Sequence, residues 1–302
     1  MSEQKDGFLM ASLLAATLPP TRWADYSLEW GQSTYVMGII NATPDSFSGD
    51  GLQTDKDDWI QRAVSQAQQF VAEGATFIDV GGESTRPHAE LVTATQEIER
   101  VVPLIRALRA ALPAQIMISI DTYKAEVAEQ ALAAGASIIN DIWALKQDPA
   151  MAEVARAHGV PVVLMANMRG YQKHEIVSDV TRFLSSAIDH ALAAGIAWEH
   201  IIIDPGIGFG TTPEENLTLL RRLGALQALG RPILLGTSRK STIGLILGGL
   251  PATERLEGTA ATVALGIAQG ADIVRVHDVR EMMRVVKMSD AIVRGTFQQP
   301  QV

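Results

Sequence analysis

The sequence predicts a (β/α)8 barrel, an α/β fold, with a short N-terminal hairpin extension. Eight short runs rich in Ile, Val, Leu and Met alternate with helical patterns along the 302 residues. Continuous apolar runs are typical of parallel strands that are buried on both faces. Several helical patterns end in Gly, and Gly-Ala leads into the next run in AEGATFIDV, AAGASIIND and AQGADIVRV. This alternation of strands and helices favours a closed barrel.

The elements follow one another in a simple order. Residues 1–33 form an extension, in which YSLEW and then GQSTYV predict a hairpin that plugs the lower mouth of the barrel. Residues 34–296 form one barrel domain, since such a barrel reaches about 250 residues as a single unit. Strands are expected near residues 35–40, 76–80, 115–121, 137–142, 160–166, 200–204, 232–237 and 271–276. The alternative is an open doubly wound sheet, but that fold carries a Gly-rich phosphate turn after its first strand, and NATPDSFSGDG stands there instead.

Composition restricts the classes of function. The net charge of −9 argues against a chain that binds nucleic acid or an anionic membrane over its whole surface. The absence of cysteine excludes disulfides, thiolate metal sites and thiol catalysis, and fits a cytoplasmic protein. No apolar run reaches the length of about 18 residues that a transmembrane helix needs.

Polar residues stand at the ends of the apolar runs. In a barrel, the carboxyl ends of the strands build the active site, so these side chains are expected at one mouth. They are Asn41, Asp79, Asp121, Asn140, Asp204, Arg275 and His277. Any single one of them also fits a helix N-cap or a turn, and Asp79, which precedes two glycines, also fits a structural role.

These residues divide into two subsites. Asp121, Asn140 and Asp204 are rich in acceptors and suit a flat heterocycle that presents N–H donors, because buried donors and carboxylates both need partners. Arg275 and His277 suit an anion such as phosphate, since arginine binds phosphate oxygens with two N–H groups.

Loop residues extend both subsites. Arg86 adds a second arginine to the anion subsite, and Asn41 offers an oxygen for Mg²⁺, which binds oxygen ligands and substrate phosphates. In GTSRKSTIG, the start of a helix at Ser241 is a place for a second anion such as a carboxylate; the alternative is a solvated basic turn. In DPGIGFG, glycines let the backbone approach a ligand and Phe209 forms a wall for a ring; the alternative is a Phe that packs inward.

Seven motifs follow one another from about Tyr35 to Val293: MGIINATPDSFSGDG, DVGGESTRPHAE, ISIDTYK, IINDI, IDPGIGFG, LLGTSRKSTIG and ADIVRVHDV. Together they resemble those of dihydropteroate synthase, a family of pterin-binding barrels. The resemblance implies a transferase that joins 6-hydroxymethyl-7,8-dihydropterin pyrophosphate to 4-aminobenzoate, giving 7,8-dihydropteroate and pyrophosphate in folate biosynthesis. It also implies Mg²⁺ as cofactor, a homodimer, and a target of sulfonamides.

The resemblance also assigns residues to roles, motif by motif. The implied pterin pocket is Asp121, Asn140, Met165, Asp204, Phe209 and Lys240. The implied aminobenzoate site is Thr85, Arg86, Phe209 and Ser241. The implied diphosphate site is Asn41, Thr85, Arg275 and His277, with Asn41 also at the metal. The implied catalytic residues are Asp121, Lys240, Arg275 and His277.

Two departures from the family pattern stand out. His88 replaces a common glycine, and Ala166 stands where a histidine often follows the Met of the fifth strand. Two other functions share the acceptor-rich pocket: a methyltransferase domain that binds methyltetrahydrofolate, and a non-catalytic protein that binds pterin phosphates. The STRP and RVH motifs, which suit a diphosphate, favour the synthase over the methyltransferase, and the intact STRP and SRKS motifs favour it over the non-catalytic protein.

Overall fold

Eight parallel strands form a barrel in the computed structural model, which describes residues 18–42, 56–84 and 91–297. The strands are β3 (Tyr35–Asn41), β4 (Phe77–Gly81), β5 (Met117–Asp121), β6 (Ile138–Asp141), β7 (Val162–Met165), β8 (Ile201–Asp204), β9 (Leu234–Leu235) and β10 (Ile273–Val276). Their order in the sheet is β8-β7-β6-β5-β4-β3-β10-β9, and a parallel bridge between Ile203 and Ile233 completes the ring. The predicted barrel is confirmed, and the open sheet is excluded.

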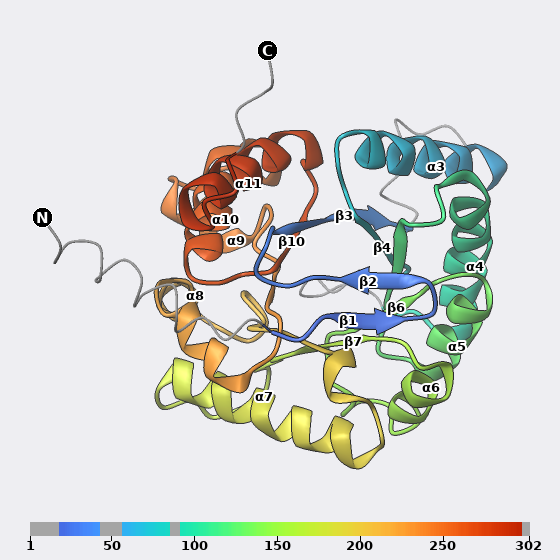
Figure 1. The fold of residues 1–302 in the computed structure, drawn as a ribbon, viewed down its shortest axis with the longest axis horizontal. Helices are drawn as coiled ribbons and strands as arrows, with labels where there is room; N and C mark the ends of the chain where they lie inside the picture. Colours follow the sequence, from blue (N-terminus) through green and yellow to red (C-terminus); the bar gives the residue numbers. More distant parts are fainter. Residues whose placement is uncertain (1–17, 43–55, 85–90, 298–302) are drawn as a thin grey trace, which may run out of the picture.

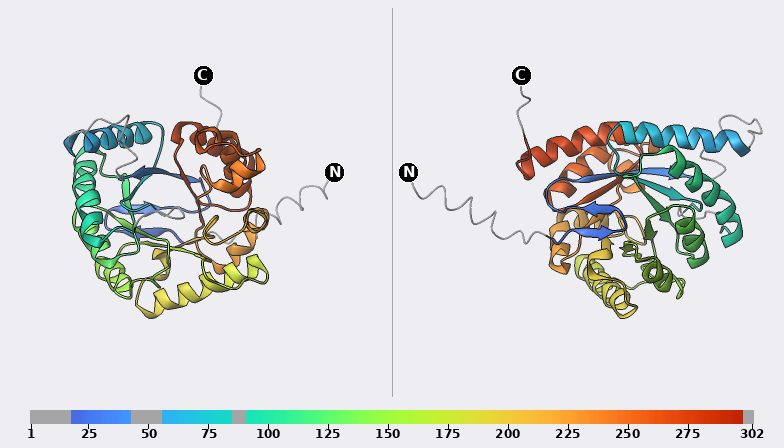
Figure 2. Two further views of the ribbon diagram at one scale, coloured as in Figure 1. Left: turned by 180° about the vertical axis from the view of Figure 1, so that it is seen from behind. Right: turned by 45° about the vertical axis from the view of Figure 1, so that its right-hand side comes forward.

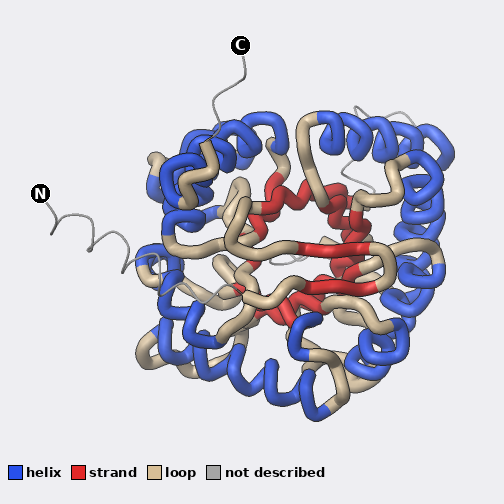
Figure 3. Tube along the Cα trace, viewed as in Figure 1, coloured by secondary structure: helices blue, strands red, loops and turns tan. Residues whose placement is uncertain are grey.

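Helices surround the barrel on the outside (Figures 1, 2 and 3). They are α3 (Lys56–Ala72), α4 (Ala94–Ala111), α5 (Ala125–Ala133), α6 (Met151–His158), α7 (Ile176–Ala193), α8 (Pro213–Arg221), α9 (Ser241–Ile246), α10 (Leu256–Ala268) and α11 (Val279–Val293). The connection after β9 departs from the simple alternation, because it holds the short α9 before α10. Within the described ranges, no helix is both long and apolar enough to span a membrane.

The Gly-Ala pairs at the ends of helices all form the same turn. Gly74, Gly135 and Gly270 have φ angles of 106°, 115° and 96°, which disfavour residues with a side chain. The following Ala N–H donates to a carbonyl five residues earlier in each case, at 2.9, 3.0 and 3.0 Å. This C-terminal capping pattern ends the helix and directs the chain into the next strand.

The N-terminal hairpin is present, but it lies earlier in the chain than the letters suggested. Its strands are β1 (Thr21–Trp23) and β2 (Tyr26–Leu28), and GQSTYV leads into β3 instead. The Trp23 indole donates to the Ser137 carbonyl at 2.9 Å, just before β6, and the Thr21 hydroxyl donates to the Glu199 carbonyl at 2.6 Å, just before β8. The hairpin therefore crosses the amino-terminal mouth of the barrel (Figure 1).

Candidate active site

The strand-end residues lie at the carboxyl edge of the barrel. Asn41 of β3 and Asp121 of β5 are both in register with the last residue of β4, and Asp121 is in register with Asn140 of β6. Met165 of β7 is likewise in register with Asp204 of β8. Because the strands are parallel and adjacent, these side chains belong to one mouth.

A buried ion-pair cluster occupies this mouth. Arg275 donates through Nε to Asp79 Oδ2 and through Nη2 to Asp121 Oδ2, each at 2.7 Å. The Asn140 amide also donates to Asp79, at 3.4 Å. From the sequence, Asp79 fitted either a functional or a structural role. It is 0% exposed and holds the Arg275 guanidinium in place.

Burial shifts the protonation equilibria of this cluster. Burial raises the pKa of Asp121 to about 7, although the charge of Arg275 acts to lower it. For Arg275 itself, burial lowers the pKa, but Asp79 and Asp121 outweigh this effect and raise it above the ordinary arginine value. The guanidinium is therefore charged at neutral pH, and Asp79 and Asp121 fix its direction.

Two further charged side chains, Asp204 and Lys240, lie beside the cluster, and the Lys240 ammonium donates to the Ile207 carbonyl. The Asp204 carboxylate is buried and accepts the Gly206 N–H at 2.7 Å through Oδ1. Burial raises the pKa of Asp204 to about 6 and lowers the pKa of Lys240 to about 8, and each of the two charges partly offsets the effect on the other. The Lys240 ammonium lies 4.3 Å from the centre of the Phe209 ring, which is half-buried and stays outside the core.

The loops after β9 and β10 bring Ser238 to His277. The Ser238 hydroxyl oxygen lies 2.9 Å from His277 Nδ1 and accepts the His277 backbone N–H at 3.1 Å. Ser241 is exposed at the first position of α9, directly after Lys240. The candidate residues of both loops thus lie at the same end of the barrel as the strand-end group.

Some predicted residues lie outside the described part of the chain. They are Thr85 and Arg86, the departure at His88, and the segment of the first loop beyond Ala42. Over the ranges that the structure describes, no three acidic or histidine side chains are grouped so that they hold a metal ion. Asn41 is half-buried at the end of β3.

A cluster that the sequence did not reveal holds the start of the loop after β4. Lys124, after β5, forms ion pairs with Glu83, after β4, and with Glu97 of α4. Glu97 is 1% exposed, and burial raises its pKa while Lys124 acts to lower it. Arg100 also donates to the Gly82 carbonyl at 2.9 Å. No spacing links these residues in sequence, because they belong to three different elements.

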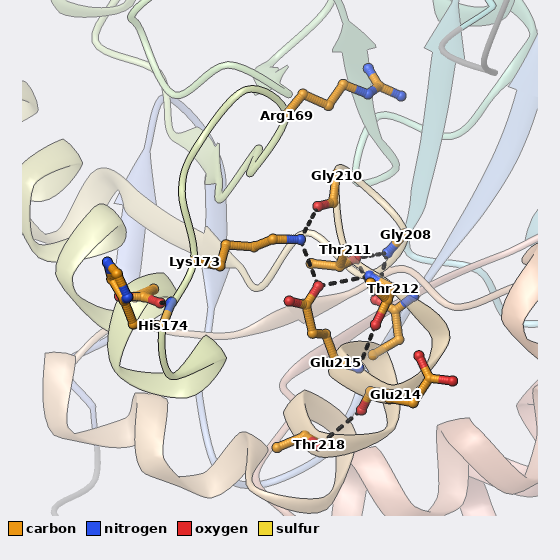
Figure 4. A network of polar contacts seen from close by, with 12 residues as sticks. Arg169, Lys173, His174, Gly208, Gly210, Thr211, Thr212, Glu214, Glu215 and Thr218 are labelled. Atoms are coloured by element: carbon orange, nitrogen blue, oxygen red, sulfur yellow. Dashed lines mark hydrogen bonds and ion pairs between the residues drawn. The ribbon is translucent and has the colours of Figure 1, made fainter.

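Two glycines of DPGIGFG allow a close approach between this loop and its neighbour. A Cβ on Gly206 would lie 2.0 Å from the Ala166 carbonyl oxygen, and a Cβ on Gly210 would lie 2.3 Å from the Arg169 amide nitrogen. The close neighbour of both glycines is therefore the loop after β7. Lys173 of that loop donates to the Gly210 carbonyl at 2.5 Å and pairs with Glu215 of α8 at 2.6 Å (Figure 4).

Comparison with known proteins agrees with this architecture. A family model described as "Pterin binding enzyme" matches residues 37–277, which is most of the barrel. By fold, site and family match, the chain is a pterin-binding barrel enzyme. A dihydropteroate synthase of Clostridium beijerinckii is 51% identical over 265 residues, which cover 87% of this chain and 96% of the relative.

Two solved structures are also similar. The crystal structure of dihydropteroate synthase from Clostridium difficile in the presence of pteroic acid is 46% identical, has a TM-score of 0.84, and the match covers 88% of this chain and 99% of that one. The Xanthomonas albilineans enzyme in complex with 7,8-dihydropteroate is 38% identical, with a TM-score of 0.82 and coverage of 91% and 98%. The chain belongs to the dihydropteroate synthase family.

Proposed function

We propose that this chain joins 6-hydroxymethyl-7,8-dihydropterin pyrophosphate to 4-aminobenzoate in a Mg²⁺-dependent reaction that yields 7,8-dihydropteroate and pyrophosphate. One observation carries the proposal: the Arg275 cluster and the Asp204–Lys240 pair are contiguous. A Cβ on Gly236 would lie 3.8 Å from Asp204 Oδ2 and 4.0 Å from Arg275 Cβ. An acceptor-rich surface for a bicyclic ring thus adjoins a fixed guanidinium.

In the proposed complex, the pterin ring lies against Asp204 and Lys240. The Asp204 carboxylate accepts N–H groups of the pyrimidine edge, and the ammonium of Lys240 donates to a ring acceptor. Buried charges of this kind need partners, and the ring adds to the hydrogen bonds that Gly206 and Ile207 already supply. Asn140 and Asp121 complete the polar edge, and Met165 and Phe209 form the apolar walls.

We assign the diphosphate to Asn41, Thr85, Arg275 and His277. A single amide oxygen at Asn41 suits Mg²⁺ only together with phosphate oxygens of the substrate, which is how this ion is commonly bound. When bound, Mg²⁺ offsets the negative charge that develops on the departing diphosphate. Arg275 and His277 supply hydrogen bonds that strengthen as that charge grows.

The reaction follows from this arrangement. The bond between the pterin methylene carbon and the diphosphate oxygen breaks, and its electron pair leaves with the diphosphate. The Asp121 carboxylate, when ionised, favours the positive charge that remains on the methylene and ring. The amine nitrogen of 4-aminobenzoate, placed by Thr85, Arg86, Phe209 and Ser241, then forms the new C–N bond and loses a proton. No covalent intermediate with the protein is needed.

The proposed homodimer uses the outer face of the last helices. Large apolar side chains are exposed there, at 65% for Leu265 of α10 and at 63% and 70% for Met288 and Ile292 of α11. Exposed apolar patches of this kind mark association surfaces. We expect Ile292→Glu to convert a dimer into a monomer in light scattering after size exclusion, and a wild-type monomer would refute this part of the proposal.

The assignment of domains and location completes the proposal. Residues 34–296 would form the pterin-binding domain and residues 1–33 an extension, in a cytoplasmic enzyme that acts on small molecules and has no nucleic-acid or membrane partner. The net charge of −9 supports the absence of a nucleic-acid or anionic-membrane partner.

One assay tests the reaction. The purified protein is incubated with the pterin pyrophosphate, 4-aminobenzoate and Mg²⁺, and dihydropteroate and pyrophosphate are measured by mass spectrometry and a coupled assay. We expect both products in equal amounts, loss of both with EDTA, and recovery on addition of Mg²⁺. Asp204→Asn should weaken binding of the pterin in calorimetry. Wild-type protein that binds the pterin pyrophosphate and forms no product would instead favour a non-catalytic binder.

A further inference from the structure

Arg169, in the loop between β7 and α7, contacts the candidate site but matches none of the roles assigned so far. Its guanidinium carbon lies 5.0 Å from the centre of the Phe209 ring. The Lys240 ammonium lies 4.3 Å from the centre of the same ring. Two cations therefore contact one aromatic side chain, which is a favourable arrangement for each cation with the ring.

The backbone around Arg169 is held in place by the loop after β8. The Met168 N–H donates to the Phe209 carbonyl at 2.9 Å, and the Arg169 N–H donates to the Asn167 side chain at 3.3 Å. The absence of a Cβ at Gly210 allows this contact between the two loops. The position of Arg169 relative to Phe209 is therefore set by the main chain, not only by its own flexible side chain.

The side chain of Arg169 points away from the ion pair between Lys173 and Glu215. Figure 4 shows that it extends away from Lys173 and Glu215, which pair with each other at 2.6 Å. Lys173 thus links the loop after β7 to Gly210 and Glu215, whereas the Arg169 side chain lies against the Phe209 ring.

The charges near Phe209 favour an anion. Burial lowers the pKa of Arg169 and of Lys240, and the positive charge of Arg169 adds to the effect on Lys240, while the negative charge of Asp204 opposes it. Two like charges in partly buried surroundings repel each other, and an anion between or beside them relieves that repulsion. In the proposed reaction the aromatic amine brings one such anion, its carboxylate, to Phe209.

We propose that Arg169 is a specificity residue that selects a negatively charged aromatic amine over a neutral one. The inference rests on the proposed function, because it concerns the second substrate of that reaction. The positive charge of Arg169 attracts the carboxylate of 4-aminobenzoate. Its contact with the Phe209 ring also keeps that ring in position beside the substrate.

The test compares two substrates of nearly equal shape and different charge. Values of kcat/KM for 4-aminobenzoate and 4-aminobenzamide are measured with wild type, Arg169→Gln and Arg169→Lys, and with Lys173→Met as a control cation from the same loop. We expect Arg169→Gln to lower kcat/KM about tenfold for the carboxylate and to leave the amide nearly unchanged. Arg169→Lys should retain most of the preference, and Lys173→Met should affect both substrates equally.

Two results would overturn the inference. An equal loss for both substrates in Arg169→Gln would show that Arg169 only supports the loop, and unchanged values would show that it has no role. A wild-type protein that forms no dihydropteroate would refute the proposed function instead. In that case, calorimetric binding of benzoate and benzamide to the same variants still tests Arg169, with loss of benzoate binding alone as the supporting result.

Discussion

The carboxylate of Asp79 offers the most direct test of the buried cluster. It is 0% exposed, and Arg275 Nε and Nη2 lie 2.7 and 2.6 Å from its Oδ2 atom. Asp79→Asn removes the negative charge and introduces N–H donors beside a guanidinium. Removal of one partner from a buried ion pair costs about 3–5 kcal/mol, because the other charge stays desolvated. Asp121 still pairs with Arg275, so we expect the lower end of that range, about 3 kcal/mol.

The measurement is the free energy of unfolding from urea denaturation, followed by circular dichroism. The control is Glu153→Gln, which removes one partner of the ion pair with Arg156, a pair whose side chains are 63% and 47% exposed. Such an exposed pair is screened by solvent and contributes little to stability. If Asp79→Asn lost no more stability than Glu153→Gln, the cluster would be no stronger than a surface pair and the reasoning would fail.

Three further predictions follow from the same geometry. We expect kcat/KM for the pterin substrate to be highest between about pH 6 and about pH 8. Asp204 gains a proton as the pH falls through about 6, and Lys240 loses a proton as the pH rises through about 8. A flat pH profile would contradict these roles. Lys124→Met should lower the free energy of unfolding by about 3–5 kcal/mol, because it removes the ion-pair partner of Glu97, which is 1% exposed. A loss under about 1 kcal/mol in urea denaturation would show that this ion pair is weak. Gly206→Ala should lower the melting temperature more than Gly159→Ala does. A Cβ on Gly206 would lie 2.0 Å from a carbonyl oxygen, whereas a Cβ on Gly159 would meet nothing within 4 Å. Equal losses would show that only the positive φ angle, which both glycines share, matters.

The strands were predictable because their signal is local. Each of the eight expected ranges overlaps an observed strand, since a buried parallel strand is a short apolar run between a Gly-capped helix and a polar loop. The predicted hairpin begins several residues later than the observed one, because strands of three residues are too short to show an alternation of apolar and polar residues. What fixes β1 is burial of Thr21 and Trp23 against the barrel, and that contact depends on residues more than a hundred positions away.

The location of the site was predictable as well, because barrel topology brings the strand ends together whatever their partners are. The ion-pair partners of Arg275 were not predictable, because Asp79 and Asp121 lie 196 and 154 residues away in the sequence. The pairing changes what Arg275 contributes: two carboxylates offset its charge, so it cannot attract a diphosphate as an isolated arginine would. With Asp121 ionised the cluster carries a net charge of about −1. The diphosphate that we propose to lie beside it would therefore need additional positive charge, which is a physical argument for the proposed Mg²⁺.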